Sequence, residues 1–308
     1  MQFFFIFALF VLFLFGCQPG QEEKNPFDYD VEKYQKTDPA LVLYKEIQGI
    51  SLSLKSVSGI AISHKDNLYV AGEESLAVFN KQGEKISQKK LDGMARCIAI
   101  DQEESIYLGI NNYIEVHQGT LIRKWADLPK NSLLTSLAVT EKDVFVADAA
   151  NKIVLRFDKS GKFINRIGEK DEKKGRQGLV IYQPHLDIAP GEPGKLWVVN
   201  PGKHRLESYD YEGNLLSFWG QPSPLITGFC GCCNPSHIAI LSDGSFITSE
   251  KNLFRIKIYD KKGKFLGVVA GMENFKRNTV PLDVARDSQN RIFILDSKSK
   301  QVRIFIPL

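Results

Sequence analysis

The sequence lacks the features that most directly assign a function class. Its 308 residues carry 40 Lys and Arg against 36 Asp and Glu, a formal net charge of only +4. Proteins that bind nucleic acid through a basic surface are usually far more cationic, so we expect no nucleic-acid partner. The chain also has no Ser-His-Asp order, no glycine-rich phosphate loop and no His-Glu-x-x-His motif. Composition and motifs therefore leave open whether the protein is an enzyme.

The apolar run at the N-terminus is too short to span a membrane. Residues 3–15 are thirteen consecutive apolar residues, whereas a transmembrane helix needs about 20. The run ends at Leu14-Phe15-Gly16-Cys17, which resembles the lipobox of bacterial lipoproteins. The resemblance implies that residues 1–16 are a signal peptide and that Cys17 is lipidated. A signal peptide without lipidation, or a buried apolar strand, is the alternative interpretation.

A polar segment follows the run. Residues 17–39 contain mixed charges and several prolines, a composition that indicates a tether rather than a folded core. A Cys17 that carries two or three acyl chains would hold the protein firmly on a membrane. We therefore expect a location in the bacterial cell envelope, on the periplasmic side of the outer membrane or on the inner membrane.

The remaining residues, 40–308, repeat one unit six times. Each copy has an apolar strand, a polar turn, a second strand, a loop and a third strand, and most end in a glycine turn. Shared cues are Ile-Ala in the first strand, as in Ile60-Ala61, and Phe-Asp or Tyr-Asp closing the third strand, as in Phe157-Asp158 and Tyr259-Asp260. This pattern resembles the NHL-repeat family of β-propellers. The resemblance implies an all-β, six-bladed β-propeller and extends to bacterial lipoproteins with a Cys-Gly-Cys-Cys-Asn-Pro loop.

The last copy stops at Leu308 directly after its third strand. Residues 40–54 are strand-like and precede the first complete copy. We expect them to pair with the end of the chain, because this pairing would close the ring and remove an exposed sheet edge.

The connection over residues 219–235 departs from the repeat. It contains Cys230, Cys232 and Cys233, three of the five cysteines of the chain, within four positions. In propellers, a segment that leads into the innermost strand of the next blade lies beside the central channel, on the face where ligands bind. We therefore expect a protein or small-molecule partner on this face.

An alignment of the first strands adds candidates to this face. The residues two places before Ala61, Ala99, Ala138, Asp187, Ala239 and Asp283 should ring one mouth of the channel; they are Gly59, Cys97, Ser136, His185, His237 and Pro281. On this alignment Cys97, His185 and His237 lie toward the loop cysteines.

Three interpretations of the cysteines stay open. A disulfide, Cys230 with Cys233 or Cys97 with a loop cysteine, would staple the long connection of an exported protein. Alternatively, Zn or Cu is bound by Cys230, Cys232 and Cys233 together with Cys97, His185 and His237, because thiolates and imidazoles suit both metals. A Cys-x-x-Cys redox role is the third, although no helix follows to lower a thiol pKa.

Two functions from different classes follow. The first is a membrane-anchored binding or scaffold module, with Asn200, Glu250 and Lys251 as residues that would face a ligand. The alternative is a metal-dependent lyase or hydrolase, because the resemblance reaches NHL-type lyases that hold Zn with histidines of the channel.

Overall fold

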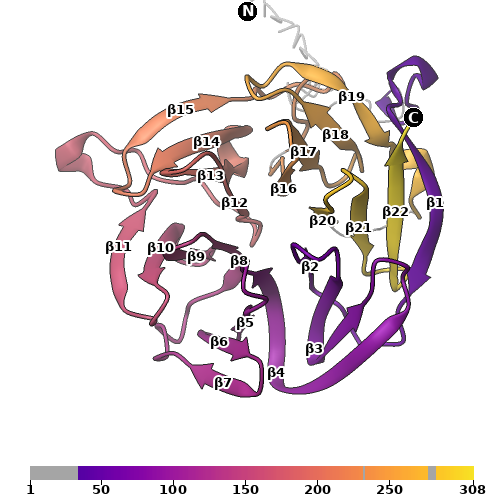
Figure 1. Cartoon of the computed structure of the whole chain (residues 1–308). Helices are drawn as coiled ribbons and strands as arrows, with labels where there is room; N and C mark the ends of the chain where they lie inside the picture. Colours follow the sequence, from indigo (N-terminus) through magenta and orange to yellow (C-terminus); the bar gives the residue numbers. More distant parts are fainter. Residues whose placement is uncertain (1–33, 232, 277–281) are drawn as a thin grey trace, which may run out of the picture.

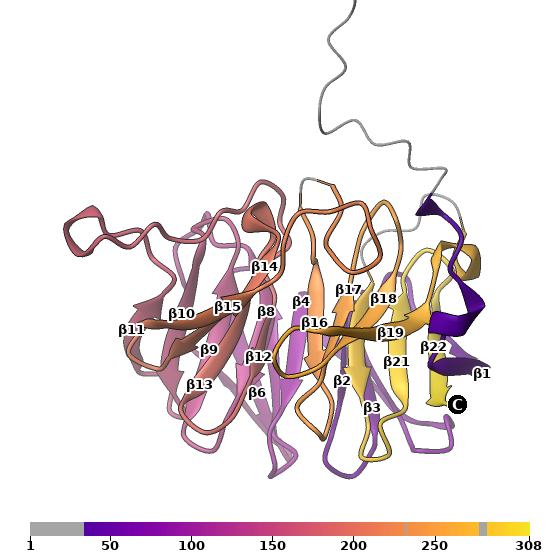
Figure 2. The same ribbon diagram turned by 90° about the horizontal axis from the view of Figure 1, so that it is seen from above.

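The computed structural model describes residues 34–231, 233–276 and 282–308. The predicted signal peptide, the lipidated Cys17, most of the tether, Cys232 and Pro281 lie outside the described residues. The strands form sheets arranged radially around a common axis (Figure 1), and the strands near that axis run from one face of the ring to the other (Figure 2). Within the described ranges, no helix has the length and apolar character that crossing a membrane requires.

Hydrogen bonding groups the strands into five antiparallel sheets. The first contains β2 (Gly59–Ile62), β3 (Leu68–Phe79), β4 (Lys85–Ile100), β5 (Ile106–Ile110), β6 (Tyr113–Gln118) and β7 (Leu121–Lys124). The second contains β8 (Leu134–Val139), β9 (Asp143–Asp148), β10 (Ile153–Asp158) and β11 (Phe163–Ile167). The third contains β12 (Ile188–Pro190), β13 (Lys195–Asn200), β14 (Arg205–Asp210) and β15 (Leu215–Trp219).

The two remaining sheets complete the ring. The fourth contains β16 (His237–Ile240), β17 (Phe246–Ser249), β18 (Ile256–Tyr259) and β19 (Phe265–Ala270). The fifth contains β20 (Asp283–Arg286), β21 (Ile292–Asp296), β22 (Gln301–Pro307) and β1 (Tyr44–Ser51). Short 3-10 turns occur at Pro39–Leu41, Glu172–Lys174, Pro201–Lys203 and Met272–Asn274.

The prediction of a propeller agrees with this arrangement, but the count of six separate blades does not agree with the five sheets. Strand β4 accounts for the difference. Its first half pairs with β3, with Lys85 opposite Phe79, and its second half pairs with β5, with Ile100 opposite Ile106. Because the chain passes from one outer strand to the next inner strand without losing strand geometry, β2 to β7 form one six-stranded sheet. Nearest the axis, the strands follow one another in the order β2, β4, β8, β12, β16 and β20, and β20 contacts β2.

The ring closes where the two ends of the described chain meet (Figure 1). Strand β1 pairs antiparallel with β22, with Tyr44 opposite Pro307 and Ser51 opposite Gln301. Across this pair the Arg303 guanidinium binds the Glu46 carboxylate through two hydrogen bonds of 2.7 and 2.5 Å. The pairing expected for residues 40–54 is therefore present over β1, and it covers the edge that β22 would otherwise expose.

Alternation along the strands builds the core between sheets. In β13, Leu196 and Val198 enter one apolar cluster, which includes Phe145 of the second sheet. Trp197 and Val199, which point to the opposite face, enter another cluster with residues of the fourth sheet. Each sheet thus buries both faces against its neighbours, so the apolar residues are covered only when the ring is complete.

Candidate functional site

The strands nearest the axis each place one residue at the same level. Strand pairing puts these residues in equivalent positions: Gly59, Cys97, Ser136, Asp187, His237 and Asp283. The alignment of first strands made from the sequence differs from the strand pairing by two residues in two of the six repeats. In those repeats Ala189 and Ala285, rather than Asp187 and Asp283, occupy the place of Ala61. Strand pairing puts His237 and Cys97 at equivalent positions, as the sequence alignment does. In the third sheet Asp187 takes this position, and His185 lies two residues before it in the chain.

Two carboxylates at this level tie neighbouring sheets together. Asp187 accepts the backbone N–H of Ile238 at 2.8 Å, and Asp283 accepts that of Ile60 at 2.8 Å. Ser136 accepts the N–H of Ile188 in the same way, at 3.3 Å. Each contact joins one inner strand to the next, so these side chains are held in place by the ring itself.

His237 lies between the two carboxylates. Its Nδ1 is 3.5 Å from Asp187 Oδ2 and 3.7 Å from Asp283 Oδ1, both longer than an ordinary N–H···O hydrogen bond. The donor atoms of the three residues lie within 4.8 Å of one another. Within the ranges that the structure describes, this is the only group of three or more His, Cys, Asp or Glu side chains with such spacing.

Burial and mutual charge set the protonation of the group. Burial raises the pKa of Asp283 to about 6, against the opposing effect of His237 and with a further increase from Asp187. Burial lowers the pKa of His237, but the Asp187 and Asp283 carboxylates outweigh it and hold this pKa above the ordinary value. The His237 imidazole and the Asp283 carboxyl therefore influence each other's protonation.

A cavity of about 480 Å³ opens beside the group. His185, His237 and Asp283 line it together with apolar residues such as Met94 and with the exposed Arg96. The rings of His185 and His237 are 6.5 Å apart, centroid to centroid. Burial, reinforced by His237 and Lys251, lowers the pKa of His185 to about 4, so its imidazole is neutral at pH 7 and able to accept a proton.

Cys97 shares the level of His237 but does not join the group. A Cβ added to Gly109 would come within 2.5 Å of the Cys97 sulfur, so this sulfur lies directly over the glycine of the adjacent strand. The side chain is 4% exposed and belongs to an apolar cluster with Leu134. Burial raises the pKa of this free thiol. Cys97 is therefore a core residue here.

The two loop cysteines that the structure describes, Cys230 and Cys233, are also not brought to the channel group. Cys230 is buried and carries a free thiol, so the Cys230–Cys233 disulfide, one of the interpretations left open by the sequence, is not formed. Its backbone N–H donates to Glu250 at 3.3 Å, and burial raises the pKa of its thiol. Cys233 is fully buried. Among the described residues, these two cysteines belong to no cluster suited to a metal.

The three residues expected to face a ligand are buried instead. Glu250 forms ion pairs with Arg255 at 2.8 Å and with Lys257 at 2.5 Å. Asn200 accepts the backbone N–H of Val180 at 3.0 Å. Lys251 hydrogen bonds through its ammonium to Gln183. Their polar atoms therefore hold neighbouring loops and side chains in place rather than facing a ligand.

Asp187 and Asp283 are the site residues that sequence reasoning missed. A signal was present, because each carboxylate directly precedes a pair that matches Ile60-Ala61 of the first copy. These pairs are Ile188-Ala189 and Val284-Ala285. An alignment on them shifts the two repeats by two residues and places both carboxylates level with His237, as the strand pairing does.

No protein-family model matches the sequence, and no curated protein matches it. Solved structures do match. A streptogramin B lyase aligns with a TM-score of 0.59 at 12% identity over 88% of this chain and 100% of its own. A catalytically inactive histidine-to-alanine variant of virginiamycin B lyase from Staphylococcus aureus, with quinupristin, aligns with a TM-score of 0.59 at 12% identity over 86% of this chain and 100% of its own.

A structural genomics protein of unknown function from Bacteroides thetaiotaomicron aligns with a TM-score of 0.62 at 12% identity, over 85% of this chain and 72% of its own. At such identities the likeness concerns the fold, which is a β-propeller in the manner of the virginiamycin B lyases.

Proposed function

We propose that the protein is an exported, membrane-anchored propeller that binds a ligand at its channel mouth through a divalent metal ion. Asp187, His237 and Asp283 would hold the metal. The observation that carries the proposal is that three inner strands bring their donor atoms within 4.8 Å of one another beside a cavity of about 480 Å³.

The donor set fits zinc. A tetrahedral Zn²⁺ with bonds near 2.1 Å separates its ligand atoms by about 3.4 Å. The distances from His237 Nδ1 to the two carboxylates, 3.5 and 3.7 Å, are close to this separation. Imidazole and carboxylate donors suit Zn²⁺ better than Cu(I), which prefers thiolates. When bound, the metal would supply a Lewis-acidic position for a ligand, while the backbone hydrogen bonds to Asp187 and Asp283 orient the carboxylates.

Metal binding is tested by titrating the chelator-treated protein with ZnCl₂ in a calorimeter. We expect one Zn²⁺ per chain, and a loss of affinity of about tenfold or more in His237→Ala and in Asp283→Asn. The asparagine keeps an oxygen that accepts the Ile60 N–H. His64→Ala is the matched control, because His64 is an exposed histidine 2.8 Å from the Glu104 carboxylate. Equal affinity in all variants would refute the site.

The membrane part of the proposal depends on Cys17. We expect Cys17→Ser to move the protein from the membrane fraction to the soluble fraction and to remove the acyl mass from the mature N-terminus. If Cys17→Ser stayed in the membrane fraction, the lipid anchor at Cys17 would be refuted, while the proposed metal site would be unaffected.

A lyase or hydrolase is a second candidate, favoured by the neutral His185 beside His237 in the same cavity. A neutral imidazole at this place is suited to take a proton from a bound substrate. Turnover of quinupristin, followed by liquid chromatography and mass spectrometry and abolished by His185→Ala, would support this candidate. Zn²⁺ binding without turnover of quinupristin would support the binding function and count against the lyase or hydrolase.

A further inference from the structure

Neighbouring sheets meet at interfaces that we call seams, and two of these seams share one kind of contact. A side chain at the end of an outer strand packs against the glycine of a turn in the next sheet. Between the third and fourth sheets this residue is Trp219, and a Cβ on Gly263 would come within 2.5 Å of its ring. Where the ring closes, between the fifth and first sheets, the residue is Ile50, whose side chain would lie 3.2 Å from a Cβ on Gly83. Both glycines have positive φ, +83° and +86°.

The side chains around this contact differ greatly between the two seams. By strand pairing, Phe246 of the fourth sheet corresponds to Leu68 of the first, and Phe265 corresponds to Lys85. Trp219, Phe246 and Phe265 are thus replaced by smaller or charged residues at the closing seam. A cavity of about 620 Å³ lies there, between β1 and the turn that contains Gly83. This volume suits a small-molecule ligand.

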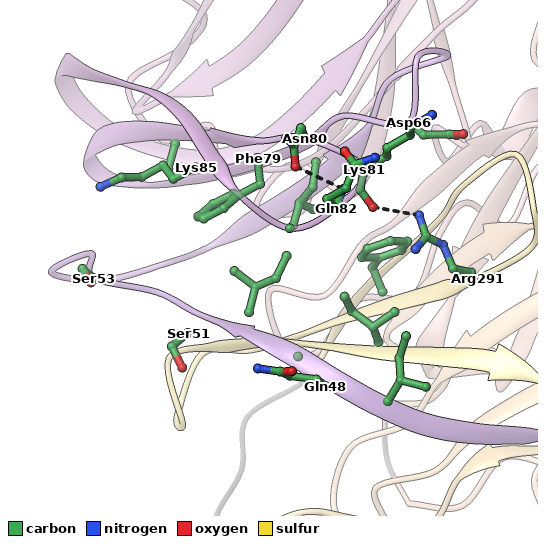
Figure 3. A pocket seen from close by; sticks show the side chains of 18 of the residues that line it. Gln48, Ser51, Ser53, Asp66, Phe79, Asn80, Lys81, Gln82, Lys85 and Arg291 are labelled. Carbon is green, nitrogen blue, oxygen red and sulfur yellow. Dashed lines mark hydrogen bonds between the residues drawn. The ribbon is translucent and has the colours of Figure 1, made fainter.

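The wall of the cavity is hydroxyl- and amide-rich. Gln48, Ser51, Ser53 and Gln82 line it, and within the described part of the chain their side chains make no hydrogen bond. In Figure 3, Gln48 and Ser51 lie on one side of the cavity, across from Gln82. Amides and hydroxyls both donate and accept hydrogen bonds, as sugar hydroxyls do. The floor is apolar and includes Phe79.

The charged side chains at the cavity are mainly cationic. Lys81, Lys85 and Arg291 line it, and Asp66 is the one acidic residue that does. Asp66 is already bound, accepting the Ser288 hydroxyl at 2.6 Å and the Ser288 N–H at 2.8 Å. Arg291 is anchored by Asp287, but Lys81 and Lys85 are exposed and in no ion pair within the described residues. The Lys81 charge interacts with Asp66 through space, and the Lys85 ammonium donates to Gln88 Oε1 at 3.1 Å. Because neither ammonium is held in a close ion pair among the described residues, both are able to pair with a negatively charged group on a ligand.

We propose that this closing-seam cavity binds an acidic oligosaccharide, with Lys81 and Lys85 meeting its carboxylates and the amides and hydroxyls of Gln48, Ser51 and Gln82 meeting its hydroxyls. The site is separate from the channel mouth, and it shares no lining residue with that cavity.

The probe is trigalacturonic acid, with maltotriose as the neutral counterpart, titrated into the mature protein and followed by calorimetry. We expect saturable binding of trigalacturonate, weakened about tenfold in the double variant Lys81→Gln, Lys85→Gln. Lys261→Gln is the matched control, because Lys261 occupies the place of Lys81 in the turn of the fourth sheet and should leave binding unchanged. Both kinds of variant change exposed residues, so folding should be preserved, and melting by circular dichroism checks this.

A second variant tests the cavity itself. Ile50→Trp combined with Lys85→Phe gives the closing seam two of the side chains of the Trp219 seam and should abolish binding of the probe while the protein remains folded. Equal binding of maltotriose, full competition by inorganic sulfate, or unchanged affinity in the lysine double variant would each overturn the proposal. Zinc titration of the same variants should be unchanged, so failure here is distinguishable from failure of the channel site.

Discussion

The seam at Trp219 and the seam at Ile50 share the contact between an outer strand and a glycine turn, but the first is filled by aromatic side chains and the second contains a cavity. At the first, the Trp219 ring packs against Phe246 and Tyr259 with centroid distances of 5.1 and 4.9 Å. At the second, smaller and polar side chains leave a cavity of about 620 Å³. A propeller repeat therefore sets where a seam contact lies, and the side chains at a few positions decide whether the seam becomes core or binding surface.

The filled seam also holds an ion cluster that anchors the cysteine loop. The Lys257 ammonium is fully buried and donates to Gly228 O at 2.6 Å and to Ile226 O at 3.0 Å. Glu250 forms ion pairs with both Lys257 and Arg255. At the closing seam Lys81 and Lys85 are exposed and have no such partner in the described chain. The charged side chains of the Trp219 seam are thus paired with one another inside the protein, whereas the lysines of the closing seam are exposed and able to contact a ligand.

The largest expected effect comes from removing the strand that makes the closing seam. Deleting residues 40–54 should expose the edge of β22 and abolish cooperative melting, because β1 supplies the outer strand and one wall of the seam. Deleting residues 18–33 is the control and should leave the melting curve nearly unchanged. Thermal melting by circular dichroism, with light scattering for aggregation, measures both. Equal melting of the two truncations would contradict the closure.

A smaller effect is expected from breaking the ion cluster of the filled seam. Glu250→Ala leaves Lys257 and Arg255 buried without their carboxylate and should cost about 3–5 kcal/mol of unfolding free energy. Glu84→Ala, at the exposed turn of the closing seam, should change it by less than about 0.5 kcal/mol. Urea denaturation measures both. Similar losses would show that the two seams do not differ in how they use charge.

The smallest effect is a pH dependence confined to the filled seam. Burial lowers the pKa of Lys257 to about 8, despite the opposing effect of Glu250, whereas an unfolded lysine titrates near 10.4. Unfolding therefore takes up a proton between about pH 8 and 10.4, and the contribution of Lys257 to stability rises with pH across this window. Relative to Lys257→Met, the wild type should gain stability between about pH 8 and 10 in urea denaturation. Lys85→Met should show no such difference, and a parallel pH profile for Lys257→Met would contradict the shift.

Local pattern was enough to predict the strands and the pairing of residues 40–54 with the chain end. It failed on the number of sheets, because nothing local shows that β4 continues from one blade into the next without interruption. It also failed on the alignment of two repeats, where the carboxylates Asp187 and Asp283 were placed at positions that Ala189 and Ala285 occupy.

The candidate site depends on contacts across the ring. His185 and His237 line one cavity, and Cys97, Cys230 and Cys233 do not join the Asp187, His237 and Asp283 group. Three cysteines within four positions are conspicuous in a sequence, whereas a carboxylate at the start of a strand is common and becomes informative only when its neighbours across the ring are known.

Sequence by itself determined the repeating strands, their alternation and the closing strand, because these depend on apolar periodicity and turn residues within one unit. Only the tertiary structure decided which polar residues meet at the axis, which charges are buried and which seam stays open. The physical reason is that each of these depends on side chains from two different sheets: Asp283 reaches Ile60 across the ring closure, and the volume left beside Ile50 depends on Leu68 and Lys85 of the next sheet.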